Sequence, residues 1–144
     1  MLVRDVLHQK GNRVISIDTE ATVHEAIARL VQNNIGSLPV MDENGRLVGI
    51  FSERDVLRIL HNRGESCGRL KMSEVMTRDP VTCDINDDVN EVMGKMSERR
   101  IAKVPVLSEG RMVGIISVGD VIKVMYDHVA TENQHLMSYI QGSH

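Results

Sequence analysis

Aromatic side chains are nearly absent from the sequence, which contains one Phe, two Tyr and no Trp in 144 residues. The core must therefore be built from aliphatic residues and from the nine Met, whose thioethers fill irregular gaps. So few aromatics also argue against the base-stacking platforms that bind single-stranded nucleic acid. The formal net charge of −3 provides no basic field for a phosphate backbone, so we predict no nucleic-acid partner.

Long hydrophobic runs and paired cysteines are missing as well. No apolar run approaches the roughly 20 residues needed to cross a bilayer. The N-terminal segment 1–12 carries charge too early for a secretory signal. Cys67 and Cys83 lack CxxC spacing, which favours free thiols over a disulfide in a chain large enough to bury its own core. These features predict a cytoplasmic protein without a membrane partner.

Signatures of catalysis and of metal binding are also missing. The sequence has no nucleophile elbow and no P-loop, and the glycines of segment 114–119 have the wrong spacing for a dinucleotide-binding fingerprint. The six histidines follow no metal-ligand spacing; they are His8, His24, His61, His128, His135 and His144. We therefore predict no enzymatic activity, no catalytic cofactor and no metal site.

What the sequence does contain is an internal repeat. Matching residues recur at an offset of 66 (105 minus 39), and then at an offset of 65 (120 minus 55) after one residue is lost in a turn. The first set is Val23, Glu25, Ile35, Pro39 and Val40, matched by Val89, Glu91, Ile101, Pro105 and Val106. The second set runs from Gly45 to Val56 and is matched from Gly110 to Val121. Chance does not produce such an ordered set, so the chain contains two copies of one unit.

Each copy has the pattern of a β-α-β-β-α unit. Short apolar runs predict strands at 14–17, 37–41 and 47–51 in the first copy and at 81–83, 103–107 and 112–116 in the second. Apolar residues at helical spacing predict helices that begin at Val23 and Val89, and closing helices begin near Asp55 and Asp120. A three-stranded sheet of this size cannot bury both faces alone. The expected fold class is therefore α/β (α+β), with two repeats packed about a pseudo-twofold axis.

The expected domain boundaries follow the repeat. Residues 1–62 form the first repeat with a short lead-in helix, and residues 63–71 form a polar linker. Residues 72–126 form the second repeat with its own lead-in, and 127–144 form a helical tail. The last three residues, Gly142-Ser143-His144, have the composition of an added tail.

Two doubled motifs carry a resemblance to a known family. Each copy has an apolar-Pro-Val strand, at Leu38-Pro39-Val40 and at Val104-Pro105-Val106. Each also has the motif G-h-h-S-x-x-D, where h is apolar, at Gly49–Asp55 and at Gly114–Asp120. From about Leu2 to Tyr126 the chain resembles a tandem cystathionine-β-synthase-type (CBS) domain pair, also called a Bateman module.

The resemblance implies a regulatory module that senses energy or redox state by binding an adenine nucleotide, AMP, ATP or NAD, in clefts between the two repeats. In similar modules the motif Asp takes the ribose hydroxyls, the motif Ser contacts phosphate, and the adenine lies against the first strand of the opposite repeat. These roles suit a carboxylate, which accepts hydroxyl hydrogen bonds, and a hydroxyl at a helix start. The resemblance also implies an unidentified regulated protein partner and a disc-like homodimer. Its expected contributors are Val56, Ile59, Leu60, Val121 and Val124.

Carried onto this chain, the resemblance gives two unequal clefts. One comprises Ser52, Arg54, Asp55, Val81, Thr82, Cys83 and Lys103. The other comprises Ile15, Ser16, Ile17, Ser37, Ser117 and Asp120. The first has Arg54 and Lys103 for a phosphate, where the second has Gly119 and Ser37. We therefore expect the Asp55 cleft to bind a charged nucleotide more tightly, although Glu53 beside Arg54 counts against it.

Other interpretations of the same residues remain open. Asp55 and Asp120 could serve only as helix N-caps, a role that suits Asp. Arg99, Arg100 and Lys103 form a small basic cluster, in which a solvated helix end explains Arg99 as well as a ligand does, whereas Lys103 is the best single candidate to bind a phosphate. The chain as a whole could be a ligand-free scaffold for dimerisation or protein interaction, although the intact Ser and Asp of both motifs speak against a degenerate module.

Overall fold

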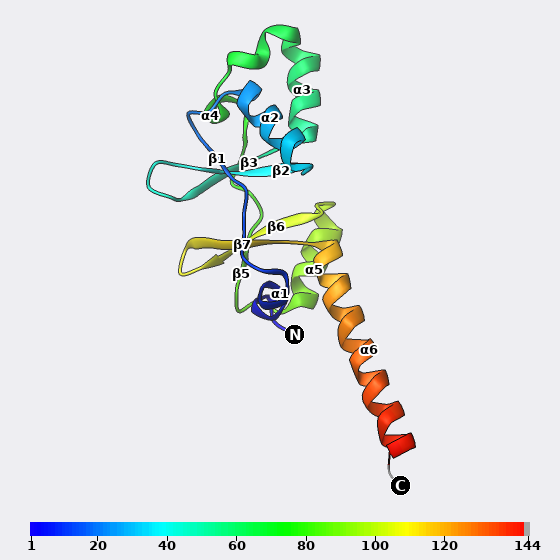
Figure 1. Cartoon of the computed structure of the whole chain (residues 1–144). Helices are drawn as coiled ribbons and strands as arrows, with labels where there is room; N and C mark the ends of the chain where they lie inside the picture. Colours follow the sequence, from blue (N-terminus) through cyan, green and yellow to red (C-terminus); the bar gives the residue numbers. More distant parts are fainter. Residues whose placement is uncertain (143–144) are drawn as a thin grey trace. The chain divides into compact units, whose positions relative to one another are not determined.

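The computed structural model describes residues 1–142, so Ser143 and His144, part of the suspected added tail, lie outside the described residues. The first copy of the repeat follows α1 (Val3–Lys10) and runs β1 (Ile17–Asp18), α2 (Val23–Asn33), β2 (Ser37–Met41), β3 (Leu47–Ser52) and α3 (Glu53–Arg63) (Figure 1). The 3-10 helix η1 (Gly64–Arg69), α4 (Met72–Val75) and β4 (Thr77–Arg78) come next. The second copy runs β5 (Cys83–Asp84), α5 (Val89–Arg99), β6 (Lys103–Ser108), β7 (Arg111–Ser117) and α6 (Val118–Gly142). The predicted mixed α/β class with two β-α-β-β-α copies is confirmed.

The chain divides into two compact units whose composition differs from that of the sequence repeats. The α6 unit consists of residues 1–12, 83–108 and the chain from Val113 onward. The α3 unit consists of residues 13–82 and 109–112. Helix α1 therefore belongs to the unit that holds the second copy, and α4 belongs to the unit that holds the first. The two lead-in segments are exchanged between the copies that they precede in the sequence.

Each unit contains one small sheet. In the α3 unit the strand order is β1-β2-β3-β4, with β1 parallel to β2 and the other neighbours antiparallel. In the α6 unit the order is β5-β6-β7, and β5 is parallel to β6. Strand β4 was not predicted, because Thr77 and Arg78 are both exposed and have no apolar alternation; they pair with Ile50 and Gly49.

The first strand of each copy is shorter than predicted. Only Ile17–Asp18 and Cys83–Asp84 pair with a neighbour, whereas the apolar runs predicted strands at 14–17 and 81–83. Apolar content favours an extended backbone, but the neighbouring strand decides where a ladder forms. The longer strands β2, β3, β6 and β7 lie within one residue of their predicted bounds.

The lead-in segments are part of the hydrophobic cores. Val3 and Val6 of α1 are fully buried in the core of the α6 unit, and Met72 of α4 is fully buried in the core of the α3 unit. The segment predicted as a polar linker also packs, because η1 buries Cys67 against the α3-unit core. Cys67 and Cys83 are both buried free thiols.

Several residues predicted for the homodimer face the interior of their own unit instead. Ile59, Val121 and Val124 are buried in the two cores, which corrects their assignment to an outer surface. The side chains that these helices do expose include Leu57 of α3 and Ile122 of α6, at the same position of the two repeats. Helical periodicity identified the apolar residues but not which of two neighbouring apolar faces is covered.

Helix α6 runs unbroken from Val118 to Gly142 and so includes residues 127–142 of the segment expected as a helical tail. No helix within residues 1–142 combines the length and the apolar character that crossing a membrane requires.

The motif glycines lie where the lead-in segments approach β3 and β7. A Cβ on Gly49 would lie 2.6 Å from Met76 Sδ and 2.9 Å from the carbonyl oxygen of Thr77. A Cβ on Gly114 would lie 2.7 Å from Cδ2 of Leu7. The glycine that begins each G-h-h-S-x-x-D motif is therefore explained by packing inside the unit, without any ligand.

This packing predicts a ranked response to Gly→Ala substitution. Gly49→Ala should destabilise the protein by about 1–3 kcal/mol, because the new methyl group meets backbone as well as side chain. Gly114→Ala should cost less, since only the flexible end of Leu7 must move. Gly94→Ala, in α5 with open space around it, is the matched control and should stabilise by about 0.5–1 kcal/mol. Denaturant unfolding measures all three, and equal effects at Gly49 and Gly94 would contradict the packing.

Candidate functional site

Each motif Ser directly precedes a helix, and each motif Asp lies in its first turn. The backbone N–H of Ser52 donates to Oδ2 of Asp55 at 2.9 Å, and that of Ser117 donates to Oδ2 of Asp120 at 2.8 Å. The N–H of Asp120 donates back to Oγ of Ser117 at 3.0 Å. This is the reciprocal arrangement of a capping box. The N-cap is therefore Ser and not Asp, and both motifs have a structural role at a helix start.

The carboxylate of Asp55 is buried and fully engaged within the α3 unit. Its side chain is 3% exposed. Oδ1 accepts from Oγ1 of Thr77 at 3.1 Å and pairs with Nη1 of Arg58 at 3.1 Å. Oδ2 accepts from the backbone N–H of Ser52 and from its hydroxyl, the latter at 3.2 Å. A carboxylate offers about four acceptor positions, so a ribose hydroxyl would have to displace one of these partners.

The carboxylate of Asp120 is more accessible and has a different partner. Its side chain is 25% exposed, and Oδ2 forms an ion pair with Nζ of Lys10 at 2.5 Å. Lys10 also donates to the carbonyl oxygen of Ile115 at 2.6 Å. Partial burial by itself raises the pKa of Asp120, but hydrogen bonds from Lys10 and Ser117 outweigh it, so the net pKa is lowered. The α6 unit thus presents an ionised carboxylate beside a lysine ammonium group.

Basic residues near the predicted site residues were missed by sequence reasoning. Lys10 lies on α1, far from Asp120 in the sequence, and no local pattern connects the two. Arg29 of α2 donates from Nη1 to the carbonyl oxygen of Ser16 at 2.6 Å. The second copy has Lys95 at the same offset of 66 (95 minus 29). The recurrence of a basic residue at the position of Arg29 and Lys95 in both copies is a signal in the sequence that could have identified Arg29.

The remaining predicted site residues differ in how exposed they are, and they lie in two different compact units. Arg54 and Lys103 are exposed, whereas Ile17 and Cys83 are buried. The half-buried ones are Ile15, Ser16, Ser37, Val81 and Thr82. Within a unit, the structure brings Ser52 to Asp55 and Ser117 to Asp120. Each predicted cleft takes members from both units, so its full composition stays a prediction.

The raised pKa of Cys83 favours the protonated thiol, the less nucleophilic form, at neutral pH. Burial raises its pKa to about 11, with a further rise from Asp87 and an opposing effect of Lys95. Its Sγ donates to the carbonyl oxygen of Pro105 at 3.8 Å. Among residues 1–142, no three His, Cys, Asp or Glu side chains are grouped so that they could hold a metal ion.

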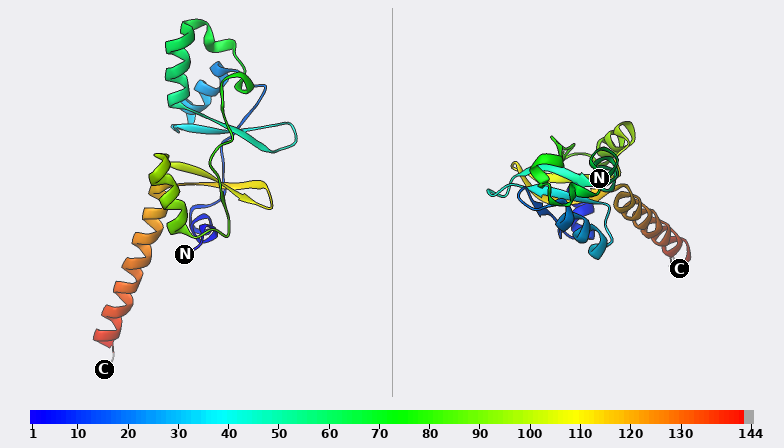
Figure 2. Two further views of the ribbon diagram at one scale, coloured as in Figure 1. Left: turned by 180° about the vertical axis from the view of Figure 1, so that it is seen from behind. Right: turned by 90° about the horizontal axis from the view of Figure 1, so that it is seen from above.

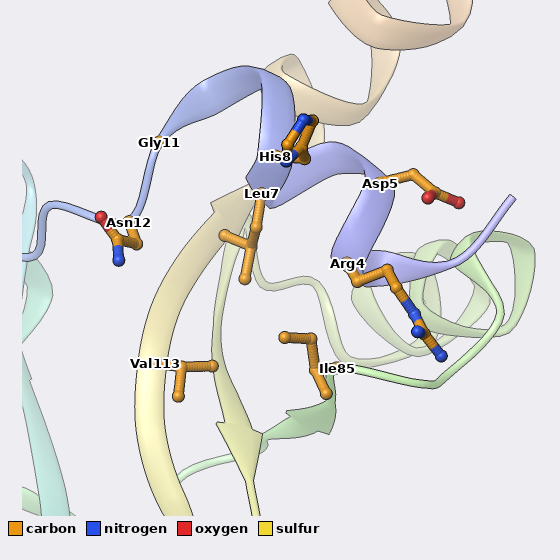
Figure 3. A pocket seen from close by; sticks show the side chains of 8 residues that line it. All are labelled: Arg4, Asp5, Leu7, His8, Gly11, Asn12, Ile85 and Val113. Atoms are coloured by element: carbon orange, nitrogen blue, oxygen red, sulfur yellow. The ribbon is translucent and has the colours of Figure 1, made fainter.

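A surface hollow of about 550 Å³ lies between α1 and β7 in the α6 unit (Figure 3). Leu7, Ile85 and Val113 provide its apolar side. Of its polar residues, Arg4 donates to Asn86 and Asp5 accepts from the backbone N–H of Leu2. These side chains stabilise the loop and the helix start, and the hollow contains none of the predicted site residues.

The family follows from a comparison with known domains. The CBS domain model matches the chain twice, over residues 3–62 and 72–127. This chain belongs to the CBS-domain family. The two matches correspond to the two copies of the repeat, each with its lead-in segment.

Similar proteins are CBS-domain proteins as well. The CBS domain-containing protein CBSX3, mitochondrial, of Arabidopsis thaliana is 32% identical over 99% of this chain and 73% of its own length. A CBS-domain-containing protein from Agrobacterium tumefaciens has a structure with a TM-score of 0.81 and 34% identity, over 87% of this chain and 99% of that one. The CBS domain pair of protein MJ0100, solved in complex with 5′-methylthioadenosine and S-adenosyl-L-methionine, has a TM-score of 0.75 and 31% identity. That match covers 89% of this chain and 98% of that one.

The Lys10–Asp120 pair predicts a pH-dependent contribution to stability. Because the pKa of Asp120 is lowered in the folded state, the contribution is present above the unfolded pKa and is lost as the pH falls through the folded pKa. Lys10→Met should raise the pKa of Asp120 and lower stability at neutral pH by roughly 0.5–1 kcal/mol. The difference should shrink in acid, where only the hydrogen bond from Lys10 to the carbonyl oxygen of Ile115 remains to be lost.

A carboxyl NMR titration and denaturant unfolding at several pH values measure these effects. Arg46→Met, an exposed cation in the turn between β2 and β3 of the other unit, is the control and should leave both unchanged. An Asp120 titration curve that is the same in Lys10→Met as in the unmodified protein would contradict the ion pair.

Proposed function

We propose that this CBS pair is a non-catalytic regulatory module that binds an adenosine-containing ligand, of the class AMP, ATP or NAD, through the Ser and Asp that begin α3 and α6. The observation that carries the proposal is the arrangement of Ser117, Asp120 and Lys10 at the start of α6. The contacts that support it all lie within one compact unit.

The chemistry of this arrangement suits a nucleotide. The partly exposed carboxylate of Asp120 can accept hydrogen bonds from the two ribose hydroxyls. The ammonium group of Lys10 beside it supplies a positive charge for a phosphate oxygen, as does the positive end of the α6 dipole. The sequence had assigned no basic residue to this cleft, so Lys10 removes the reason for ranking it second.

We expect the Asp55 motif to bind the nucleotide more weakly than the sequence suggested. All the partners of the Asp55 carboxylate belong to its own unit, and the side chain is nearly inaccessible. A ligand that binds Asp55 must replace hydrogen bonds that the carboxylate already makes. Because no bond is added overall, the net free energy of binding is smaller. We therefore expect the nucleotide to bind more tightly at the Asp120 motif than at the Asp55 motif.

Binding at Asp120 also offers a route to a response. A ribose hydroxyl on Asp120 competes with Nζ of Lys10, which is carried by α1 and also binds the carbonyl oxygen of Ile115. A ligand shifts a protein only by its differential affinity for two states. Here the two states would differ in whether Lys10 is held by Asp120 or by the ligand phosphate.

The comparisons support the ligand class at a coarser level. Protein MJ0100 binds two adenosine derivatives in its CBS pair, which is a property of that protein. The regulated partner belongs to the proposal as well. The match to this chain spans 73% of the Arabidopsis protein and 47% of a similar protein from Methanocaldococcus jannaschii.

Calorimetric titration of the dialysed protein with AMP, ADP, ATP, NAD and S-adenosylmethionine tests the proposal. We expect saturable binding of at least one ligand, weakened in Asp120→Ala by about 1–3 kcal/mol, the scale of a lost buried hydrogen bond. Asp55→Ala should mainly lower thermal stability, because it removes the partner of Arg58 and Thr77.

Three outcomes count against parts of the proposal. Unchanged affinity in a folded Asp120→Ala protein would exclude this site. Absence of binding by all five ligands would favour the ligand-free scaffold. Conversion of the nucleotide to a product, detected by chromatography, would contradict the non-catalytic role.

A further inference from the structure

Helix α6 carries an apolar stripe with the spacing of a coiled-coil seam. We call it the α6 stripe; its residues are Ile122, Tyr126, Val129, Asn133, Leu136 and Ile140. They are separated alternately by four and three positions, which is the a/d pattern of a heptad repeat. The five apolar members are exposed by 56%, 71%, 52%, 60% and 65%, so the whole stripe faces solvent in the single chain.

The stripe is distinct from the face by which α6 packs on its own unit. Val121 and Val124 belong to the core of that unit, and Met125 packs against it. At 3.6 residues per turn, the stripe is rotated from this core face by about 100°. Figure 1 and Figure 2 show α6 continuing beyond the other elements of its unit, and residues 131–141 are all exposed.

This exposure leaves the distal part of α6 without support from within residues 1–142. Helical segments without tertiary contacts are marginally stable in water, because most helical stability comes from packing an apolar face. Met137 and Tyr139, which flank the stripe, are more than half exposed as well. A contiguous exposed apolar surface of this kind is typical of a protein interaction site.

Asn133 indicates what the partner is. In a parallel two-stranded coiled coil, identical heptad positions meet, so Asn133 would face Asn133 of a second copy and each amide could donate to the other. In an antiparallel pair, a positions face d positions, and Asn133 would lie against Val129 or Leu136. A buried amide without a partner is costly, and an unrelated apolar helix would impose the same cost.

We propose that the α6 stripe is an interface for a second copy of this chain, and that two α6 helices form a parallel, in-register coiled coil. Val129, Asn133, Leu136 and Ile140 lie beyond the matched CBS domain, which ends at residue 127. Most of the stripe therefore lies outside the repeats, and Asp120 is not one of its members.

Disulfide cross-linking of the full chain tests the interface and its direction. Ile140→Cys places a thiol on the stripe, and Ser138→Cys places one on the opposite side of the helix two residues away. The native Cys67 and Cys83 are buried, so the introduced thiol is the reactive one. At micromolar protein under mild oxidation, Ile140→Cys should form a covalent dimer on the order of tenfold faster than Ser138→Cys, because a coiled coil gives its thiols a high effective concentration.

Two results would overturn the proposal. Equal cross-linking rates for Ile140→Cys and Ser138→Cys would mean that the stripe is not an interface between copies. Cross-linking in a mixture of Ile122→Cys and Ile140→Cys, with none in Ile140→Cys alone, would mean an antiparallel pair. Residues 122, 138 and 140 are all exposed on the helix surface, and circular dichroism verifies that each cysteine variant is folded.

A substitution on the stripe gives an independent measurement. Leu136→Asp should abolish the cross-linking of Ile140→Cys and reduce the helical signal of the full chain, whereas Gln134→Asp, on a different side of the helix, should change neither. Retention of cross-linking in the Leu136→Asp background would contradict a seam through this residue.

Discussion

The close approach of each lead-in segment to a motif glycine is the contact on which the rest of the structure depends. Leu7 packs over Gly114 and Met76 over Gly49, in each case across the sequence repeats. Val3 and Val6 are buried in the core that holds the second copy, and Met72 in the core that holds the first, so neither segment packs in the core of the copy that it precedes. A compact unit is therefore complete only when it receives the segment that precedes the other copy.

The same exchange makes two nearly identical motifs chemically different. Helix α4 is short, and the chain leaves it as β4, whose pairing with β3 brings the Thr77 hydroxyl to the carboxylate of Asp55. Helix α1 continues through Lys10, which reaches Asp120 instead. One carboxylate becomes a buried structural acceptor, and the other becomes a partly exposed ion pair. The differing ends of the lead-in segments thus decide which of the two carboxylates stays partly exposed.

Helix α6 combines both kinds of apolar surface found in this chain. Its first turns contribute Val121 and Val124 to a core, and these positions match Val56 and Ile59 of α3. The rest of the helix has no counterpart in the first copy, because α3 ends at Arg63. The sequence repeat therefore explains which residues of α6 pack in the core. The heptad spacing describes the apolar residues in the part of α6 that has no counterpart in α3. Core packing and the proposed association of two chains thus use two different faces of one helix.

The sequence by itself determined the repeat, the β-α-β-β-α order and the pairing of each motif Ser with its Asp. All of these depend on residues a few positions apart, where apolar periodicity and the geometry of a helix start act directly. Only the tertiary structure decided that Asp55 is buried, that Lys10 neutralises Asp120, that Thr77–Arg78 is a strand and that Ile59 faces inward. Each of these depends on a segment distant in sequence, and local spacing does not encode which segment covers a surface or places a charge beside it.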